Sequence, residues 1–567
     1  MYNFYIFIVY YTLILVSIIG YGLFFLKLFK IKLDLINFGY AGLFGIYILI
    51  IYSYFSNFFI AHSEFHNLLV LFIGLILFIY SIKQKYFLYK NEIIFSFVVF
   101  VIIFLAVLQF KNHDDFEYYH FPYTYYLTQQ SLHIGIGQFN HGFRTPSSIF
   151  YINSLFYLPY AKFYLFNFFS LFILGFANII LLKKIHNYFR FVSTKDKQLK
   201  LTHFLSLLSF IFINIFFSRV SEHGTDRSAQ ILILILIGEI LSFVNFKVKI
   251  EKHLSKLFLL IALIISLKAF YTLYIIFFSI ILYKLVNSYK IKVIAHYILS
   301  NVYLYLFLVL FSLIIVVNFL NTGCLIYPVS MTCFDNNIWA ISKSEVTAVN
   351  NWYELWSKGG ANPNFRTDDP EIYIKKFNWV NNWTNQYFFT KVSDFLLGLI
   401  VLAIVVFINF FPYKKNTKNY YKGRNITFTI VIISILFVEW FYNHPSLRYG
   451  GFCLIASFLF VIFSLKIEKS KLKFLNIKKR VTYLIVFTLI VFLGRNINRI
   501  SKEYNQYGYN PIKNVFYRAE DANFVINGKM KNIIKSYNNC IKPEKNCNNK
   551  ENIGVKKISN KFVFFTK

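Results

Sequence analysis

The stretch LFLLIALIISLKAFYTLYIIFFSIILY, Leu257 to Tyr283, decides how the rest of the chain is arranged. It is apolar apart from Lys268 near its middle, and it is longer than the roughly 20 residues that cross a bilayer core about 30 Å thick. As one helix it would reverse the side of every later loop. As two short half-helices that turn at Lys268, it keeps the lysine-bearing loops on one side of the membrane. We therefore predict a break at Lys268.

Apolar runs of similar length recur along the whole chain. The sequence is 57% hydrophobic and only 15% charged, which is too apolar for a soluble core. Because backbone exposed to lipid must satisfy its own hydrogen bonds, such runs fold as helices. We expect an all-α polytopic membrane protein with about fourteen crossings, two of them the half-helices at Lys268. The other expected crossings are 3–25, 35–61, 68–82, 93–110, 163–183, 201–217, 229–246, 297–319, 393–412, 426–441, 450–466 and 480–495.

The basic residues indicate an orientation. The formal net charge is +34, but the lysines and arginines lie in short clusters at alternate junctions rather than on one patch. This is the pattern of the positive-inside rule, and it argues against nucleic acid as a partner. Both termini are then expected outside. The chain divides into additional N-terminal transmembrane helices (1–92), a core module with outer loops 111–162 and 321–392 (93–392), C-terminal transmembrane helices (393–495) and an extracytoplasmic tail (496–567).

Four of the five cysteines form two close pairs in polar segments on the expected outer side. Cys324 lies near Cys333, and Cys540 lies near Cys547. Their spacings do not match a usual zinc site. The pairs predict two disulfides in an oxidising compartment; unpaired thiols are the alternative.

The densest acidic cluster follows the uncharged run that ends at Phe110. The segment KNHDDFEYYHFPYTYY, Lys111 to Tyr126, places Asp114 and Asp115 at the membrane boundary. Partial desolvation there raises the basicity of a carboxylate, which suits a general base. The alternative is a solvated helix cap, since Asp readily begins a helix.

Further polar groups fall at the ends of expected crossings on the same outer side. An intramembrane lysine costs roughly 2.5–3.5 kcal/mol on insertion scales, so Lys268 is a functional candidate by default. Arginine binds phosphate through a fork of donors and lysine as a point charge. Snorkelling of Lys268, and contacts of the arginines with lipid phosphates, are the competing interpretations. The other candidates are His141 and Arg144 before Pro146, Asp226 before the run at 229–246, and His444 with Arg448 between two apolar runs.

The order of these features resembles the GT-C superfamily of membrane glycosyltransferases, especially protein O-mannosyltransferases and lipid A aminoarabinose transferases. The matching elements are the acidic pair opening the first large outer loop, a His-to-Pro turn, Asp226 opening a later helix, and the LIISLKAFYT element around Lys268. Three crossings precede the acidic loop, where the family usually has one helix leading into it. The paired prolines usual in the family are reduced to Pro146.

The resemblance implies transfer of a sugar from a polyprenyl-phosphate donor to a glycan, lipid or protein acceptor in the cell envelope. The site would face the exterior of a bacterial inner (cytoplasmic) membrane. Asp114 or Asp115 would be the base of an inverting displacement, with Asp226 orienting the acceptor or assisting. The resemblance assigns donor phosphate binding to Arg144, Lys268, His444 and Arg448, and acceptor binding to Glu117, His120 and His141. No cofactor is required.

Four alternatives stay open at the sequence level. A transporter or flippase of lipid-linked saccharide would need a charged path through the bilayer, for which Glu239 and Lys268 are the only deep charges. A surface-polysaccharide polymerase or ligase would differ only in its acceptor. A divalent metal enzyme could use Asp114, Glu117 and His120, because Glu117 and His120 share a helix face at i, i+3. The fourth is a structural role without catalysis.

Overall fold

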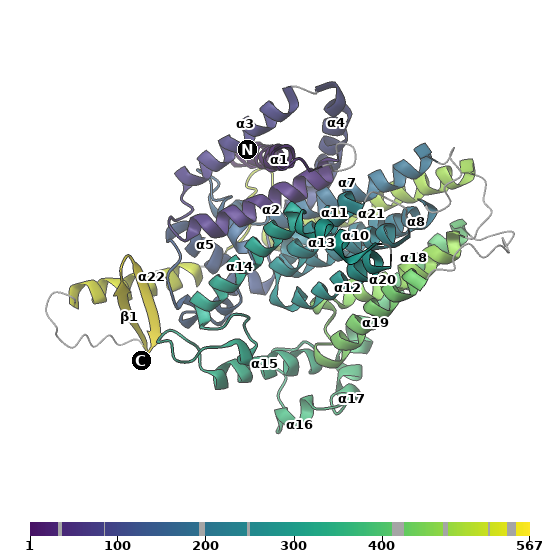
Figure 1. The fold of residues 1–567 in the computed structure, drawn as a ribbon. Coiled ribbons are helices and arrows are strands. Elements are labelled where there is room, and N and C mark those ends of the chain that lie inside the picture. Colours follow the sequence, from purple (N-terminus) through teal and green to yellow (C-terminus); the bar gives the residue numbers. More distant parts are fainter. Residues whose placement is uncertain are drawn as a thin grey trace.

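The computed structural model describes residues 1–31, 37–83, 86–191, 199–245, 250–287, 289–410, 424–468, 474–519, 522–540 and 552–567. Most of it is helical, and long helices pack side by side through the middle of the molecule (Figure 1). Within these ranges, eleven helices are long and apolar enough to cross a membrane, and three shorter apolar helices accompany them. The protein is therefore an α-helical polytopic membrane protein, as predicted.

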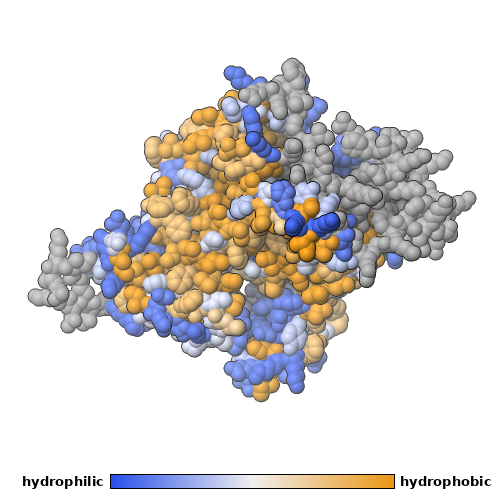
Figure 2. Space-filling model, in the orientation of Figure 1, coloured by the Kyte–Doolittle hydropathy of each residue, from blue (hydrophilic) through white to orange (hydrophobic). Residues whose placement is uncertain are grey.

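The long helices divide into central and peripheral members. In the spans Phe163–Phe189 and Thr225–Val244, 94% of the residues are buried by other helices, whereas only 28% are buried in the span Val302–Thr322. Hydrophobic side chains accordingly cover much of the middle of the face in Figure 2. The membrane-length elements are α1 (Tyr2–Leu28), α2 (Phe38–Asn57), α3 (Glu64–Lys83), α4 (Tyr86–Ile103), α7 (Phe168–Phe191), α10 (Thr225–Asn245), η6 with α12 (Ala269–Ile276 and Phe277–Val286), α14 (Val302–Thr322), α18 (Ser393–Phe410), α19 (Arg424–Asn443) and α21 (Phe474–Tyr507); the shorter ones are α8 (Leu199–Phe216), α11 (Ile250–Leu267) and α20 (Gly451–Glu468).

The predicted break at Lys268 is confirmed. Helix α11 ends at Leu267, and Lys268 has extended backbone angles, φ −162° and ψ 140°. The rings of Phe258 and Phe278, each ten residues from Lys268, are 5.1 Å apart, so the chain reverses at the lysine. The helix before the break, α11, begins at Ile250, before the apolar run, and has 18 residues. At 1.5 Å per residue it is about 27 Å long.

The polar segments gather at one end of the bundle, which we call the loop face. It carries 111–162, 321–392, 442–449 and the C-terminal hairpin. In Figure 1, α15, α16 and α17 lie together at the lower edge of the molecule and the hairpin lies at the left. Its elements are η2 (Phe116–His120), α5 (Phe121–Gln129), η4 (His141–Arg144), α6 (Ser148–Ser154), α9 (Val220–His223), α15 (Lys343–Lys358), α16 (Pro370–Ile374), α17 (Val380–Trp383), η8 (Thr384–Val392), η9 (Leu447–Tyr449), α22 (Ala522–Cys540), β1 (Ile553–Ile558) and β2 (Lys561–Thr566).

Two features of the loop face bear on the predicted organisation. Cys324 and Cys333 form a disulfide, which confirms the first predicted pair. The second pair, Cys540 with Cys547, lies outside the part of the chain whose side chains the structure describes. The boundary expected at 496 does not end a helix, since α21 continues to Tyr507.

The C-terminal hairpin is attached to the loop after α5. Strands β1 and β2 are antiparallel, with Ile553 opposite Thr566. The Ile134 N–H donates to the Phe562 carbonyl at 2.9 Å, and the Phe564 N–H donates to the Ile134 carbonyl at 2.9 Å. The tail therefore lies on the same side of the bundle as segment 111–162.

Candidate functional site

Four polar side chains from distant parts of the chain meet at the loop face. Asp115 precedes the first turn of η2, and Asp226 is the second residue of α10. Lys268 occupies the turn after α11, and Arg448 lies in η9 between α19 and α20. We call these four residues the charge network.

The contacts within the charge network are direct. Lys268 Nζ donates to Asp226 Oδ1 at 2.6 Å, and Arg448 Nε donates to Asp226 Oδ2 at 2.6 Å. Arg448 Nη2 also donates to Asp115 Oδ2. Arg448 therefore joins the two carboxylates, and two cations balance two anions.

Exposure differs across the charge network. The Asp226 side chain is only 5% exposed, whereas Lys268, Arg448 and Asp115 are 22%, 26% and 26% exposed. Asp226 is thus more deeply buried than the other three, whose side chains are partly exposed.

Hydrogen bonds from neighbouring helices hold the two cation-bearing turns. The carbonyl of Leu267 accepts a hydrogen bond from Ser147 Oγ at 2.5 Å; the last carbonyls of a helix have no partner within the helix. The carbonyl of Arg448 accepts one from Gln230 Nε2 at 2.9 Å. Because these turns are fixed in place, Lys268 and Arg448 point at Asp226 without further rearrangement.

An aromatic residue that the sequence did not single out covers the lysine. Lys268 Nζ lies 4.9 Å from the centre of the Tyr449 ring, within the range of cation–π attraction. The Trp356 ring of α15 lies 5.5 Å from the same tyrosine, so the long loop 321–392 covers this side of the site. The position of Tyr449 beside Arg448 in the RYGG sequence was the available signal.

The electrostatics of Asp115 correct one expectation. Burial raises the pKa of the Asp115 carboxyl, but Arg448, His120 and His113 together outweigh burial and hold that pKa below its usual value. The predicted increase in basicity is therefore wrong for this arrangement, because the arginine stabilises the carboxylate.

Of the two adjacent aspartates, Asp115 is the one bound to Arg448. Asp114 is exposed. The backbone N–H of Asp115 donates to His113 Nδ1 at 3.2 Å, and the His113 N–H donates to the Glu222 carbonyl at 3.3 Å. These bonds anchor the segment just before η2 to the turn that leads into α10.

The two expected acceptor residues on η2, Glu117 and His120, differ in how deeply they are buried. His120 is buried against the rings of Tyr119 and Phe150, at 4.3 and 5.1 Å. Burial lowers the pKa of His120 to about 3, although Asp115 opposes this shift, so the imidazole is neutral at neutral pH. Glu117 is half-buried. Within the described ranges no three His, Cys, Asp or Glu side chains converge as metal ligands, so Asp114, Glu117 and His120 do not form the alternative metal site.

Arg144 and His141 form a separate contact with the long loop. Arg144 Nη1 donates to Glu345 Oε1 of α15 at 2.7 Å, and its Nε donates to the Gly137 carbonyl at 3.1 Å. His141 Nδ1 is 3.5 Å from the same guanidinium. Arg144 is thus paired with Glu345, which the sequence did not single out, and lies outside the charge network; its expected phosphate-binding role stays a prediction.

His444 lies beside the charge network but is not a cation there. Its ring is 5.3 Å from Phe270 and 5.9 Å from Tyr449. Burial, and secondarily Lys358, lowers the pKa of His444 to about 4. The imidazole is therefore neutral at neutral pH, and it could meet a donor phosphate only through a hydrogen bond; its expected role in phosphate binding stays a prediction.

The fold and the site define an integral membrane protein whose polar residues converge at one end of a helical bundle. The chain belongs to the DUF8201 family, described as a domain of unknown function, whose model matches residues 4–455. The matched region contains all four residues of the charge network. No protein with a curated description matches the chain, and no solved structure matches it.

Proposed function

We propose that the protein is a GT-C-type glycosyltransferase that moves a sugar from a polyprenyl-phosphate donor to an acceptor in the cell envelope. The observation that carries the proposal is the charge network, in which Arg448 and Lys268 are held together at a membrane boundary beside Asp115. Two preorganised cations stabilise the charge that develops on a departing phosphate.

The proposed reaction needs one base and no catalytic acid. The acceptor hydroxyl attacks the anomeric carbon, and the carbon–oxygen bond to the phosphate breaks with its electron pair on the phosphate oxygen. Asp115 takes the proton of the attacking hydroxyl, and the anomeric centre inverts. Arg448 and Lys268 bind the phosphate, and Asp226 holds both cations in place.

Donor binding would itself activate the base. A donor phosphate attracts Arg448 away from Asp115, which removes the charge that keeps the pKa of Asp115 low. The carboxylate then accepts a proton more readily, at the moment when the leaving group is in position. In the absence of donor, Asp115 stays paired and weakly basic.

A cleft of about 20 Å³ lies beside the lysine turn, and it would have to widen to hold the lipid part of such a donor. It is lined by Pro146, Ile265, Ala269, Phe311 and Ile314, among others, between the turn and α14. Ile265 and Ala269 flank Lys268 in sequence. A polyprenyl chain in this cleft would bring its phosphate to the lysine from the bilayer.

The proposed location is a bacterial inner membrane, with the loop face on the extracytoplasmic side. The Cys324–Cys333 disulfide lies on that face, and disulfides persist in oxidising compartments. A surface-polysaccharide polymerase or ligase would use the same chemistry with a different acceptor.

A flippase for lipid-linked saccharide is the second candidate, and one observation favours it. Glu239 of α10 is 1% exposed and pairs with Lys184 Nζ at 2.7 Å. It lies thirteen residues beyond Asp226, about 20 Å along the helix at 1.5 Å per residue. Polar groups at two depths of one central helix are a feature that transport pathways use.

The test compares Asp115→Asn with Asp114→Asn, its exposed neighbour. In membranes supplied with a polyprenyl-phosphate sugar, we expect Asp115→Asn to lower the transfer rate at least about 100-fold, as for loss of a general base. Asp114→Asn should stay near the wild-type rate. Equal rates for wild type and both variants, at equal protein levels, would exclude Asp115 as the base. A wild-type protein that moves labelled lipid across vesicles without transferring sugar would favour the flippase.

A further inference from the structure

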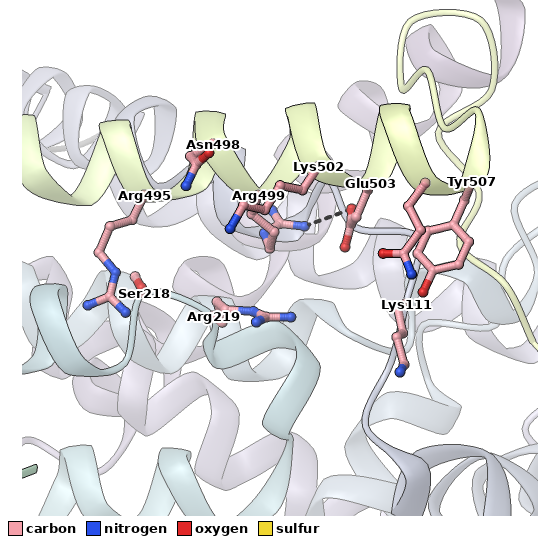
Figure 3. Close-up of a pocket in the computed structure, with 10 residues that line it drawn as sticks. Lys111, Ser218, Arg219, Arg495, Asn498, Arg499, Lys502, Glu503 and Tyr507 are labelled. Atoms are coloured by element: carbon pink, nitrogen blue, oxygen red, sulfur yellow. Dashed lines mark hydrogen bonds and ion pairs between the residues drawn. The ribbon is translucent and has the colours of Figure 1, made fainter. Parts of the chain in front are cut away.

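A second polar cavity lies at the loop face, formed by other residues than the charge network. It lies between the last turns of α21 and the turn after α8, and has a volume of about 450 Å³. Volumes of about 300–1,000 Å³ are usual for small-molecule sites. In Figure 3, Arg495, Arg499 and Lys502 extend from α21 toward Ser218 and Arg219, and Lys111 lies at the other side.

The charges around this cavity do not balance. Five cations line it: Lys111, Arg219, Arg495, Arg499 and Lys502. The carboxylate in its lining is Glu503, and Glu222 lies behind it, paired with Arg219. Five cations against two carboxylates leave an excess of three positive charges.

The two carboxylates are buried and already engaged. Glu503 Oε2 accepts hydrogen bonds from Arg499 Nη1 at 3.2 Å and from the Phe110 N–H at 3.1 Å. Glu222 Oε1 accepts one from Arg219 Nε at 2.8 Å. The buried Arg499 Nε has no hydrogen bond, its nearest carboxylate oxygen being that of Glu222 at 3.6 Å. The acids thus fix the base of the cavity, while Lys111, Arg219, Arg495 and Lys502 are exposed.

The cavity lies at the boundary of the bilayer. Lys111 follows the apolar span that ends at Val107, and Arg219 follows the apolar helix that ends at Phe216. This is the level at which lipid phosphates lie. The turn that carries Arg219 also leads into Asp226, so the cavity and the charge network share one segment.

We propose that this cavity is a binding site for a phosphate-bearing anion. Lys111 and Lys502 supply point charges, and Arg495 keeps N–H groups beyond the Nη1 that donates to the Ile215 carbonyl at 2.5 Å. Arg219, whose Nε and Nη2 contact Glu222, adds its remaining N–H groups. Lysine and arginine together suit phosphate oxygens. The anion is either the headgroup of an anionic lipid or a free phosphorylated molecule. The site is independent of the proposed sugar transfer, because it uses none of the residues assigned to that reaction.

The test uses the purified full-length protein and matched variants of α21. Arg495→Gln with Lys502→Gln removes two of the exposed cations, and Lys502→Gln alone changes a surface residue without disturbing packing. Lys478→Gln, an exposed lysine near the opposite end of the same helix, is the control. Calorimetric titration with inorganic pyrophosphate in neutral detergent probes the free anion. Native mass spectrometry of protein from phosphatidylglycerol or phosphatidylcholine nanodiscs probes the headgroup.

We expect the double variant to bind at least about tenfold more weakly than wild type, since hydrogen bonds to charged groups are strong ones. Lys502→Gln should show a smaller loss and Lys478→Gln none, and binding should weaken with salt. Pyrophosphate binding with this variant pattern supports a free anion. Retention of phosphatidylglycerol alone with the same pattern supports a headgroup. Binding of both probes by the Arg495→Gln and Lys502→Gln double variant that equals binding by wild type and Lys478→Gln would overturn the proposal.

Discussion

Replacing Arg448 by Gln removes the residue that joins the two carboxylates, so its effect on stability tests the charge network directly. Arg448 donates to Asp226, which is 5% exposed, and to Asp115, which is 26% exposed. Hydrogen bonds to charged groups contribute about 1.5–3 kcal/mol each, and two of them set an upper range of about 3–6 kcal/mol.

The structure reduces that range in two ways. Asp226 keeps Lys268 as a partner at 2.6 Å, and Asp115 is exposed enough to be rehydrated. Partly exposed ion pairs contribute less than buried ones. We therefore expect Arg448→Gln to lower the free energy of unfolding by about 2–3 kcal/mol.

Reversible unfolding in mixed detergent micelles measures this difference. Lys478→Gln is the control and should lie within about 0.5 kcal/mol of wild type, as surface substitutions usually do. A double-mutant cycle of Arg448→Gln with Asp226→Asn isolates the pair, and we expect a coupling of about 1–2 kcal/mol. A coupling near zero, with both single variants folded, would refute the network as a stabilising contact.

Three further predictions concern pH and the long loop. The pKa of Asp115 in the folded protein is held below its value in the unfolded chain. The ionised carboxylate therefore stabilises the fold above about pH 4, and this contribution is lost as the pH falls through the folded pKa. Acid titration of unfolding should show a smaller loss of stability for Asp115→Asn than for wild type. His120 stays neutral down to about pH 3 in the folded protein, whereas His120 of the unfolded chain binds a proton below about pH 6.5. Acidification below about pH 6.5 therefore destabilises the folded wild type by up to about 1.4 kcal/mol per pH unit. The acid titration of unfolding should give a flatter profile for His120→Asn than for wild type between about pH 6 and 4. Replacing both Cys324 and Cys333 by Ser opens a short loop and should lower the free energy of unfolding by about 2–3 kcal/mol, and reductant should reproduce the change in wild type but not in the variant; no effect of either would argue against the disulfide.

The fold was largely predictable because apolar length and charge placement are local properties of the sequence. The break at Lys268 followed from one lysine in a run too long for a single crossing. The length of α11 could not be predicted in the same way, because its first turn contains Glu251, Lys252 and His253, a polar sequence that is typical of a loop.

The charge network was predictable only in part. Asp226 and Arg448 were identified because each is a charge at the end of an apolar run, and Lys268 because it interrupts one. The choice between Asp114 and Asp115 depended on the direction of the first turn of η2, which two adjacent identical residues do not reveal. The neutral state of His444 and the pairing of Arg144 with Glu345 depend on packing between segments that are far apart in sequence. No local sequence pattern indicates which distant segments pack together.

The order in which the network residues are synthesised has a consequence for membrane insertion. Asp226 precedes Lys268 by 42 residues, so the nascent chain already carries a counter-charge when the lysine enters the translocon. Asp115, in contrast, is synthesised 333 residues before its partner Arg448. A chain arrested between Lys268 and Arg448 would therefore hold its lysine neutralised while its first acidic segment is still without its arginine. The site is completed only when Arg448, early in the last quarter of the protein, has been made.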